Sequence, residues 1–275
     1  MLRISANIST LFNELPLLDR PGAAASAGFA AVEVQFPYVV AGNDLAKGCS
    51  DAGVDMVLLN ISAGRLDEGE LGLACLPGRE SDFRYAVEEA IAYALLLRCP
   101  MVNCLAGNIP ADATRSACWE ILVRNLRYAA ARFETEGIRL LVEPLNRRDH
   151  PTFILAGIEE AAELLSDVAH PNLSLQYDAY HMRAAGEDWL GEIVRHRGAI
   201  GHIQFSDFPG RHEPGSGDMD MAALFQTISA SDYTGWTGAE YRPSGTTPES
   251  LGWFADLSNQ FPSILRGSAQ HGNIA

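Results

Sequence analysis

Short apolar runs alternate with longer amphipathic stretches along the whole chain. Eight of these runs have the length and composition of buried strands. They lie at residues 2–8, 29–36, 54–60, 100–105, 138–143, 173–178, 200–205 and 235–240. Alternation of strand and helix is typical of a parallel sheet, and eight units favour closure into a barrel. The pattern therefore predicts an α/β fold, a single (β/α)8 TIM barrel over residues 1–262.

The stretches between the runs repeat their apolar positions at helical spacing. Residues 115–135 form the clearest such stretch, and Gly137 follows where a helix would end. Ser81 and Asp82 precede residues 83–90 as an amino-terminal cap would. Further helices are predicted at 156–168, 189–196, 219–229 and 247–260. Residues 7–12 contain no glycine, so the phosphate loop of an open nucleotide-binding sheet is missing after the first strand.

Charge and composition limit the possible partners. The net charge of −15 and the pI of about 4.8 make nucleic acids and anionic membranes poor partners. No run of 18 apolar residues occurs, so no membrane span is expected. The five cysteines contain no CxxC pair and no apolar signal segment precedes the first strand, which predicts reduced thiols and a cytoplasmic protein. Residues 263–275 are expected to form a small polar tail, and the protein is expected to be a homo-oligomer, a dimer or tetramer.

Lysine is almost missing from the chain. Lys47 is the only lysine among 20 basic residues, and its surroundings predict an exposed helix. Schiff-base aldolases and pyridoxal-phosphate enzymes need a buried, desolvated lysine. Covalent catalysis through lysine is therefore not expected.

Four oxygen-bearing side chains occur at the ends of the last four strands of the predicted barrel. Glu143, Asp178, Gln204 and Glu240 are separated by 35, 26 and 36 residues, about one strand-plus-helix unit each. A parallel barrel would bring all four to one rim. Three carboxylates and an amide oxygen are hard ligands that suit Mg²⁺ or Mn²⁺. The spacing therefore predicts a divalent metal site and a metal-dependent enzyme.

Each of these residues also has a structural interpretation when taken alone. Glu143 could be a salt-bridged strand end, Asp178 a helix cap, and Glu240 a partner of Arg242. His181 alone would more often be a satisfied core histidine than a ligand. Four such groups at four consecutive strand ends favour the functional interpretation.

The same set permits isomerisation of an α-hydroxycarbonyl compound. A cation that holds two adjacent oxygens would polarise the carbonyl and stabilise an enediolate. Glu143 and Glu240, from strands on opposite sides of the barrel mouth, could remove a proton from one carbon and return it to the next. The predicted reaction is that of an aldose–ketose isomerase or an epimerase.

The chain resembles the hydroxypyruvate isomerase family of the xylose isomerase-like barrel superfamily. Seven segments carry the resemblance: RISAN at 3–7, ACLPGRE at 74–80, VEPLN at 142–146, QYDAYH at 176–181, GHIQ at 201–204, EPGSG at 213–217 and GWTGAEY at 235–241. It implies that Glu143, Asp178, Gln204 and Glu240 bind the metal and that the two glutamates transfer the proton. It also implies a small hydroxy-oxo acid substrate: hydroxypyruvate and tartronate semialdehyde, or a related 2-oxotetronate.

Departures from the family pattern concern the substrate. Related ketose epimerases carry histidine where this chain has Gln204, which favours the isomerase branch, although a ketose or inosose substrate stays an alternative. They carry glutamate at the position of Asp149, which could contact the substrate through a shorter arm. The loop after the third strand, NISAGRL at 60–66, also differs from the family. Its Arg65 could bind a carboxylate or could be a solvated loop arginine.

Further side chains are candidates for substrate binding. Arg211 follows the strand of Gln204, and its guanidinium could grip a carboxylate with two hydrogen bonds or could pair with Glu213. His181 could bind a substrate hydroxyl, and Asn103 could line the pocket. Asn7 and Glu33 are weaker candidates of the same kind.

Two other function classes deserve comparison. Endonucleases share this barrel superfamily, but they need several metals, many histidines and a basic groove, whereas this chain has seven histidines and a net charge of −15. A non-catalytic binding or scaffold protein would not need a divalent ion at all.

Overall fold

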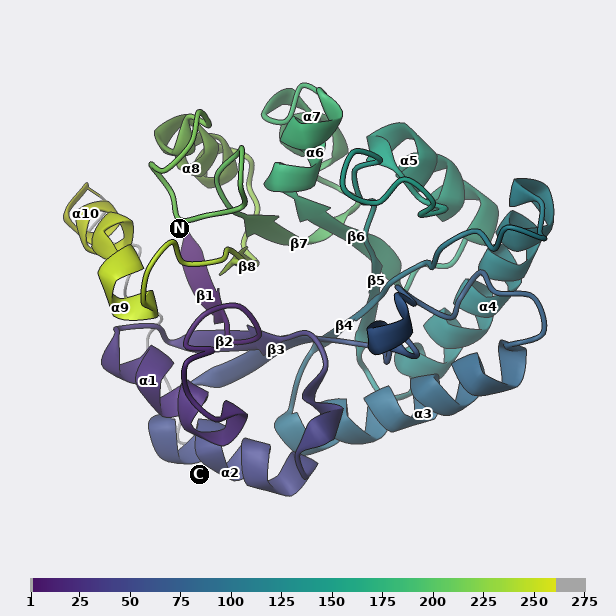
Figure 1. The fold of residues 1–275 in the computed structure, drawn as a ribbon, viewed down its shortest axis with the longest axis horizontal. Helices are drawn as coiled ribbons and strands as arrows, with labels where there is room; N and C mark the ends of the chain where they lie inside the picture. The colour runs from purple at the N-terminus through teal and green to yellow at the C-terminus, as the bar shows by residue number, and fades with distance from the viewer. Residues whose placement is uncertain (1, 261–275) are drawn as a thin grey trace.

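The computed structural model describes residues 2–260, which form a closed barrel of parallel strands (Figure 1). The strands are β1 (Arg3–Asn7), β2 (Ala31–Val34), β3 (Asp55–Asn60), β4 (Met101–Cys104), β5 (Arg139–Val142), β6 (Leu173–Asp178), β7 (Ile200–Phe205) and β8 (Trp236–Ala239). Each strand pairs with the next along the chain, and β1 pairs with β8 to close the ring. The predicted (β/α)8 barrel is confirmed.

Helices surround the strands on the outside of the ring (Figure 1). They are α1 (Arg20–Ser26), α2 (Gly42–Ala52), α3 (Glu80–Leu97), α4 (Arg115–Thr135), α5 (Gly157–Val168), α6 (Ala179–Ala185), α7 (Gly191–His196), α8 (Met221–Ala230), α9 (Thr247–Ser250) and α10 (Gly252–Gln260). Three short 3-10 turns add η1 (Leu17–Asp19), η2 (Pro37–Val39) and η3 (Leu66–Glu68). The predicted domain boundary at 262 and the tail at 263–275 lie outside the described residues.

The structure corrects several predicted helix boundaries. Helix α3 begins at Glu80 after Arg79, so Ser81 and Asp82 lie in its first turn and do not cap it. Asp82 instead pairs with Arg79, and a negative charge there still complements the helix dipole. Helix α6 was not predicted, because it is a single short segment directly after β6. Gly137 takes a φ of 70° after α4, as predicted for a residue that ends a helix.

Apolar side chains pack the helices against the barrel. On α4, Leu122, Leu126 and Phe133 repeat at helical spacing and are fully buried. Burial of each such side chain stabilises the fold by about 1.5–3 kcal/mol. Close packing also favours glycine in β7, since a Cβ at Gly201 would lie 2.6 Å from Cδ2 of Leu141 and would displace that side chain. Within residues 2–260, no helix combines the length and the apolar character needed to cross a membrane.

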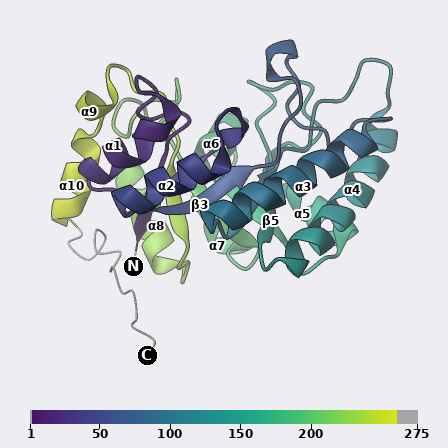
Figure 2. The ribbon, with the colours of Figure 1, turned by 90° about the horizontal axis from the view of Figure 1, so that it is seen from below.

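Strand register places the candidate residues at one end of the barrel. Asp178 is in register with Gln204, and Gln204 with Gly238 on β8. The backbone N–H of Glu240 then donates to the carbonyl of Phe205 at 3.0 Å. In Figure 2 the long loops rise at one end of the barrel, while the N-terminus lies near the other. The carboxyl-terminal rim therefore holds the candidate site.

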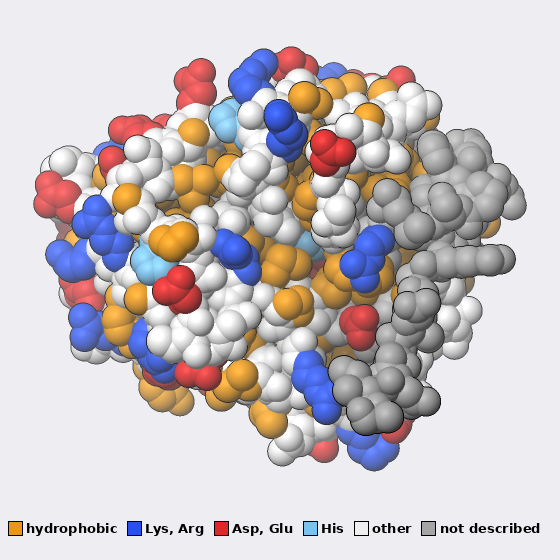
Figure 3. All heavy atoms as spheres, turned by 180° about the vertical axis from the view of Figure 1, so that it is seen from behind, with side chains coloured by type: hydrophobic (Ala, Val, Ile, Leu, Met, Phe, Trp, Pro, Cys, Tyr) orange, Lys and Arg blue, Asp and Glu red, His pale blue; other side chains and the backbone are white. Residues whose placement is uncertain are grey.

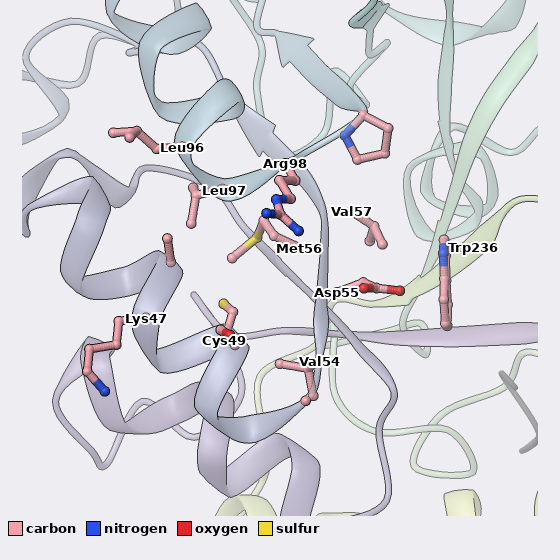
Figure 4. Close-up of a pocket in the computed structure, with 14 residues that line it drawn as sticks. Lys47, Cys49, Val54, Asp55, Met56, Val57, Leu96, Leu97, Arg98 and Trp236 are labelled. Carbon is pink, nitrogen blue, oxygen red and sulfur yellow. The ribbon is translucent and has the colours of Figure 1, made fainter. Parts of the chain in front are cut away.

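A separate cavity of about 670 Å³ lies at the opposite end (Figure 4). Asp55 and Trp236, the first residues of β3 and β8, border it together with Cys49 and Lys47 of α2 and with Arg98. Because its lining includes the beginnings of strands, this cavity is remote from the rim that holds the candidate carboxylates.

Candidate active site

Each of the last four strands places one buried oxygen-bearing side chain at the carboxyl-terminal rim. Asp178 ends β6, and Gln204 is the penultimate residue of β7. Glu143 and Glu240 directly follow β5 and β8. All four residues are at most 5% exposed. The cost of burying three carboxylates must therefore be offset by partners at the site.

Two groups of contacts connect these residues. Glu143, Asp178 and His181 each offer an atom within 4.8 Å of the others, a spacing at which they could hold a metal ion. Glu240 joins the group through Arg211, whose Nη2 donates to Oδ2 of Asp178 at 2.9 Å and to Oε1 of Glu240 at 2.6 Å. The structure thus brings together the three predicted carboxylates, and it adds His181, which the sequence placed only at the substrate.

The amide of Gln204 lies between two polar neighbours. Its Nε2 donates to Oε1 of Glu33 at 2.7 Å, and its Oε1 accepts from Nε2 of Gln176 at 2.6 Å. A carbonyl oxygen has two lone pairs, so one is left for a further donor or a cation. The same Gln176 Nε2 also donates to Oε2 of Glu143 at 2.9 Å, which links the two predicted ligands.

Arg211 reaches the site from a tightly held loop after β7. Asp207 accepts hydrogen bonds from the backbone of Gly215, Gly217 and Met219 at 2.8–3.0 Å and so closes this loop. A Cβ at Gly217 would lie 2.3 Å from the carbonyl of Phe208, so glycine is required there. Arg211 itself has a φ of 58°. Its guanidinium binds Asp178 and Glu240 and, among the contacts of the described residues, forms no ion pair with Glu213, which binds Ser244.

His181 and Asp149 lie on the side of the site towards α6. Nδ1 of His181 lies 2.7 Å from Nδ2 of Asn146, and its Nε2 lies 3.1 Å from Nη1 of Arg211. Burial and the charge of Arg211 lower the pKa of His181 well below its ordinary value, so the imidazole is neutral at pH 7. The carboxylate of Asp149 is exposed and accepts from Tyr180 at 2.9 Å and from Asn146 at 3.0 Å. Asp149 therefore lies beside the cluster of buried carboxylates but is not part of it.

Asn103 lies next to Glu143. Its Nδ2 donates to Oε2 of Glu143 at 3.1 Å, whereas its Oδ1 is buried and has no hydrogen-bond partner among residues 2–260. Within the described part of the chain, Oε1 of Gln176 is also buried without a hydrogen-bond partner. Buried oxygens of this kind are normally satisfied, which indicates that the site is built to receive a further group.

Electrostatics point to a shortage of positive charge. Burial, together with the charges of neighbouring carboxylates, raises the pKa of Glu143 and of Asp178, and raises the pKa of Glu240 to about 7. Burial would lower the pKa of Arg211, but the charges of Glu240, Asp178 and Glu143 outweigh it and raise that pKa. One guanidinium thus faces three carboxylates. This surplus of hard oxygen donors fits a divalent cation.

The structure also tests the structural roles that the sequence allowed for Asp178 and Glu240. Asp178 does cap α6, since its Oδ1 accepts from the N–H of Tyr180 at 2.9 Å. Its other oxygen binds Arg211, so the capping role and the site role coexist. Glu240 pairs with Arg211 and, among the described contacts, has no ion pair with Arg242.

Some side chains at the site were missed by sequence reasoning. Gln176 and His202 lie two residues before Asp178 and Gln204, so they point to the same face of their strands, one layer deeper in the barrel. Gln35 donates to Oε1 of Glu240 at 3.0 Å. For Gln176 and His202, the sequence signal was a polar residue two positions before a candidate metal ligand.

Comparison with known proteins identifies the family. A family described as xylose isomerase-like TIM barrel matches residues 21–257. The chain is 43% identical to hydroxypyruvate isomerase of Escherichia coli (strain K12) over 92% of this chain and 98% of that protein. It is 39% identical to 2-oxo-tetronate isomerase of Cupriavidus necator over 92% of this chain and 97% of that protein.

Solved structures agree on the fold. A crystal structure of a Brucella melitensis protein described as AP endonuclease, family 2, superposes with a TM-score of 0.90 at 39% identity, covering 93% of this chain and 99% of that one. D-psicose 3-epimerase of Clostridium cellulolyticum H10, at 19% identity and a TM-score of 0.73, shares the fold. The chain therefore belongs to the xylose isomerase-like TIM barrel family and, within it, to the hydroxypyruvate isomerase family, which confirms the predicted family and its isomerase class.

Proposed function

We propose that the protein is a metal-dependent isomerase that interconverts hydroxypyruvate and 2-hydroxy-3-oxopropanoate (tartronate semialdehyde), or a related 2-oxotetronate pair. One observation carries the proposal: three buried carboxylates of raised pKa lie at the rim, and Arg211 pairs with two of them, Asp178 and Glu240. The E. coli and C. necator relatives, named for these two reactions, support this substrate class.

Four side chains would hold the cation, which we infer to be Mg²⁺ or Mn²⁺. They are Glu143, Asp178, Gln204 and Glu240, with His181 close enough to share the site. When bound, the cation supplies Lewis-acid polarisation of the substrate carbonyl and neutralises developing negative charge. All the donors except His181 are hard oxygens, which favours these ions over zinc held by thiolates.

The two glutamates then act on neighbouring carbons of the substrate, one as a general base and the other as a general acid. In the forward direction one glutamate removes a proton from C3 of hydroxypyruvate, and an enediolate forms. The other delivers a proton to C2, while the hydroxyl proton moves from the C3 oxygen to the C2 oxygen. A glutamate carboxylate can accept a proton as a general base, and a glutamate carboxylic acid can donate one as a general acid. Neutral His181 can hydrogen-bond a substrate oxygen during these steps.

Recognition of the acid would depend on Arg211. Its Nη1 and Nη2 already reach His181, Asp178 and Glu240, so the guanidinium lies where a substrate carboxylate could take over one of these bonds. We infer that Asn103 and Asp149 contact the rest of the substrate. A guanidinium that grips two oxygens would favour acids over neutral sugars.

A substrate screen tests the proposal. Hydroxypyruvate, 2-oxotetronates and free ketoses would each be incubated with the protein and Mg²⁺ or Mn²⁺, and products separated by chromatography. Turnover of an acid, weakened by Arg211→Ala, is expected. A neutral ketose or inosose preferred over every acid, with little effect of Arg211→Ala, would instead select the epimerase alternative.

Other properties of the chain support a cytoplasmic, small-molecule enzyme. The five cysteines are buried and free, as reduced thiols would be. On the face shown in Figure 3, Lys and Arg side chains are scattered among acidic ones, without the basic patch that nucleic acid requires. We further propose a homo-oligomer, dimer or tetramer, which size-exclusion chromatography with light scattering would test.

A further inference from the structure

A fourth buried carboxylate, that of Glu33, lies next to the candidate metal site. Glu33 of β2 is fully buried, and each of its oxygens accepts two hydrogen bonds. Oε2 accepts from Ser5 at 3.0 Å and lies 2.8 Å from Nε2 of His202. Oε1 accepts from Asn7 at 3.1 Å and from Gln204 at 2.7 Å. Proton transfer and metal binding, as proposed above, make no use of this group.

The contact with Gln204 decides which end of its amide faces the metal site. An amide has a donor end and an acceptor end of nearly equal shape, so packing alone does not choose between them. A carboxylate only accepts, so Glu33 requires the NH₂ group of Gln204 on its side. The carbonyl oxygen of Gln204 must then point the other way, towards Gln176 and the candidate ligands. The reversed amide would set two oxygens against each other at Glu33 and would turn a donor towards a cation.

Asn7 extends the same control to a second ligand. Its Nδ2 donates both to Oε1 of Glu33 and to Oε2 of Glu240, at 3.1 Å each. One carboxylate therefore orients Gln204 directly and Glu240 through one intermediate side chain. Partners of this kind behind metal ligands fix their geometry, and their loss commonly weakens metal affinity by about 10–100-fold.

The sequence of β8 reserves space for this carboxylate. A Cβ at Gly238 would lie 2.3 Å from Oε2 and 2.4 Å from Oε1 of Glu33, so any side chain there would displace it. The three heavy atoms nearest to that Cβ all belong to Glu33. A substitution at Gly238 is thus a way to move the carboxylate while keeping it in the protein.

We propose that Glu33 is a positioning residue for the metal site: it holds the amide oxygen of Gln204 towards the cation and, through Asn7, holds Glu240 in place. This inference rests on the proposed function. It assigns to Glu33 no contact with the substrate and no proton transfer. Its predicted effect is on the affinity for the cation, which can be measured without any substrate.

Titration of chelator-treated protein with Mn²⁺, followed by electron paramagnetic resonance of the free ion, tests this role. Glu33→Met has nearly the same length but no acceptor, and it should weaken Mn²⁺ binding by about 10–100-fold. Glu33→Gln keeps one oxygen that can face Gln204, while Ser5 and His202 can accept from its NH₂ group, so it should bind Mn²⁺ more tightly than Glu33→Met. Ser5→Ala removes one bond to Glu33 without touching either ligand, and its affinity should stay within about twofold of wild type.

The outcomes separate this inference from the proposed function. A folded Glu33→Met variant with wild-type Mn²⁺ affinity would overturn the positioning role. If Glu33→Met does not fold, Gly238→Ala decides: a loss of about tenfold or more supports the role, and unchanged affinity refutes it. Wild-type protein that binds no Mn²⁺ would contradict the proposed metal site itself, and the inference would fall with it.

Discussion

Replacing Arg211 by alanine removes the guanidinium that bridges two buried carboxylates. Nη2 lies 2.9 Å from Asp178 and 2.6 Å from Glu240, and these two acidic side chains are 1% and 6% exposed. The arginine side chain is 18% exposed, so solvent screens it only in part. The carboxylates that remain would lose their nearest positive charge.

The expected cost follows from this geometry. Breaking a buried ion pair by removing one partner costs about 3–5 kcal/mol. We expect the lower end, about 3 kcal/mol, because the arginine is partly exposed and because Glu240, with a pKa of about 7, can take up a proton. For a chain of this size that loss corresponds to a decrease in Tm of roughly 6–12 °C.

Differential scanning calorimetry of chelator-treated protein at pH 7.5 or so would measure the change. Arg183→Ala is the matched control, since its pair with Asp218 is 35% and 57% exposed and should contribute less than about 1 kcal/mol. Saturation with Mn²⁺ should shrink the loss in the Arg211 variant, because a cation would neutralise the same carboxylates. A metal-free Arg211→Ala protein that melts within about 2 °C of wild type would refute this electrostatic reasoning.

Three further predictions concern Glu240 and the loop that contains Gly72. Glu240→Gln should lower kcat by about 10²–10⁴-fold while the protein stays folded. Near-full activity in a steady-state assay would exclude proton transfer by this residue. In metal-free protein, burial raises the pKa of Glu240 from 4.5 to about 7, so the native state binds more protons than the unfolded state between these values. The free energy of unfolding of the metal-free protein should therefore fall by about 3 kcal/mol as the pH rises from 4.5 to about 7. Urea titrations that show a rise instead would contradict the burial argument. Gly72→Ala places a Cβ 2.1 Å from the carbonyl of Leu105 at a φ of 120° and should destabilise the protein by more than about 2 kcal/mol in urea titrations. Gly69 has a φ of 83°, and a Cβ added there would meet no atom of the described residues within 4 Å beyond its chain neighbours. Gly69→Ala is therefore the control for backbone strain alone, and equal losses would contradict the packing argument.

The barrel could be predicted from the sequence because each strand is a short apolar run, separated from the next by a longer amphipathic stretch. Parallel topology then places every strand end on one rim, whatever the details of the loops. Glu143 and Glu240 were therefore recognisable as site candidates from their positions after Val142 and Ala239. Their roles in metal binding and proton transfer stay predictions.

The contacts that depend on closure of the ring could not be predicted in the same way. Glu33 gathers donors from β1 and β7, and only the three-dimensional register of three strands brings these together. The reach of Arg211 depends on a loop closed by Asp207, whose turns the sequence does not specify. Helix α6 was missed because seven residues are too short for a periodic signal, and its position explains why His181 lies beside Asp178.

Isomerisation of hydroxypyruvate by metal-stripped and reconstituted protein tests the central claim most directly. Activity should vanish on chelation and return in proportion to Mn²⁺ bound, reaching its maximum at about one ion per chain, as one site built from three carboxylates and an amide requires. Full activity in protein stripped of divalent ions, or one bound ion per chain without any isomerase activity, would contradict the account.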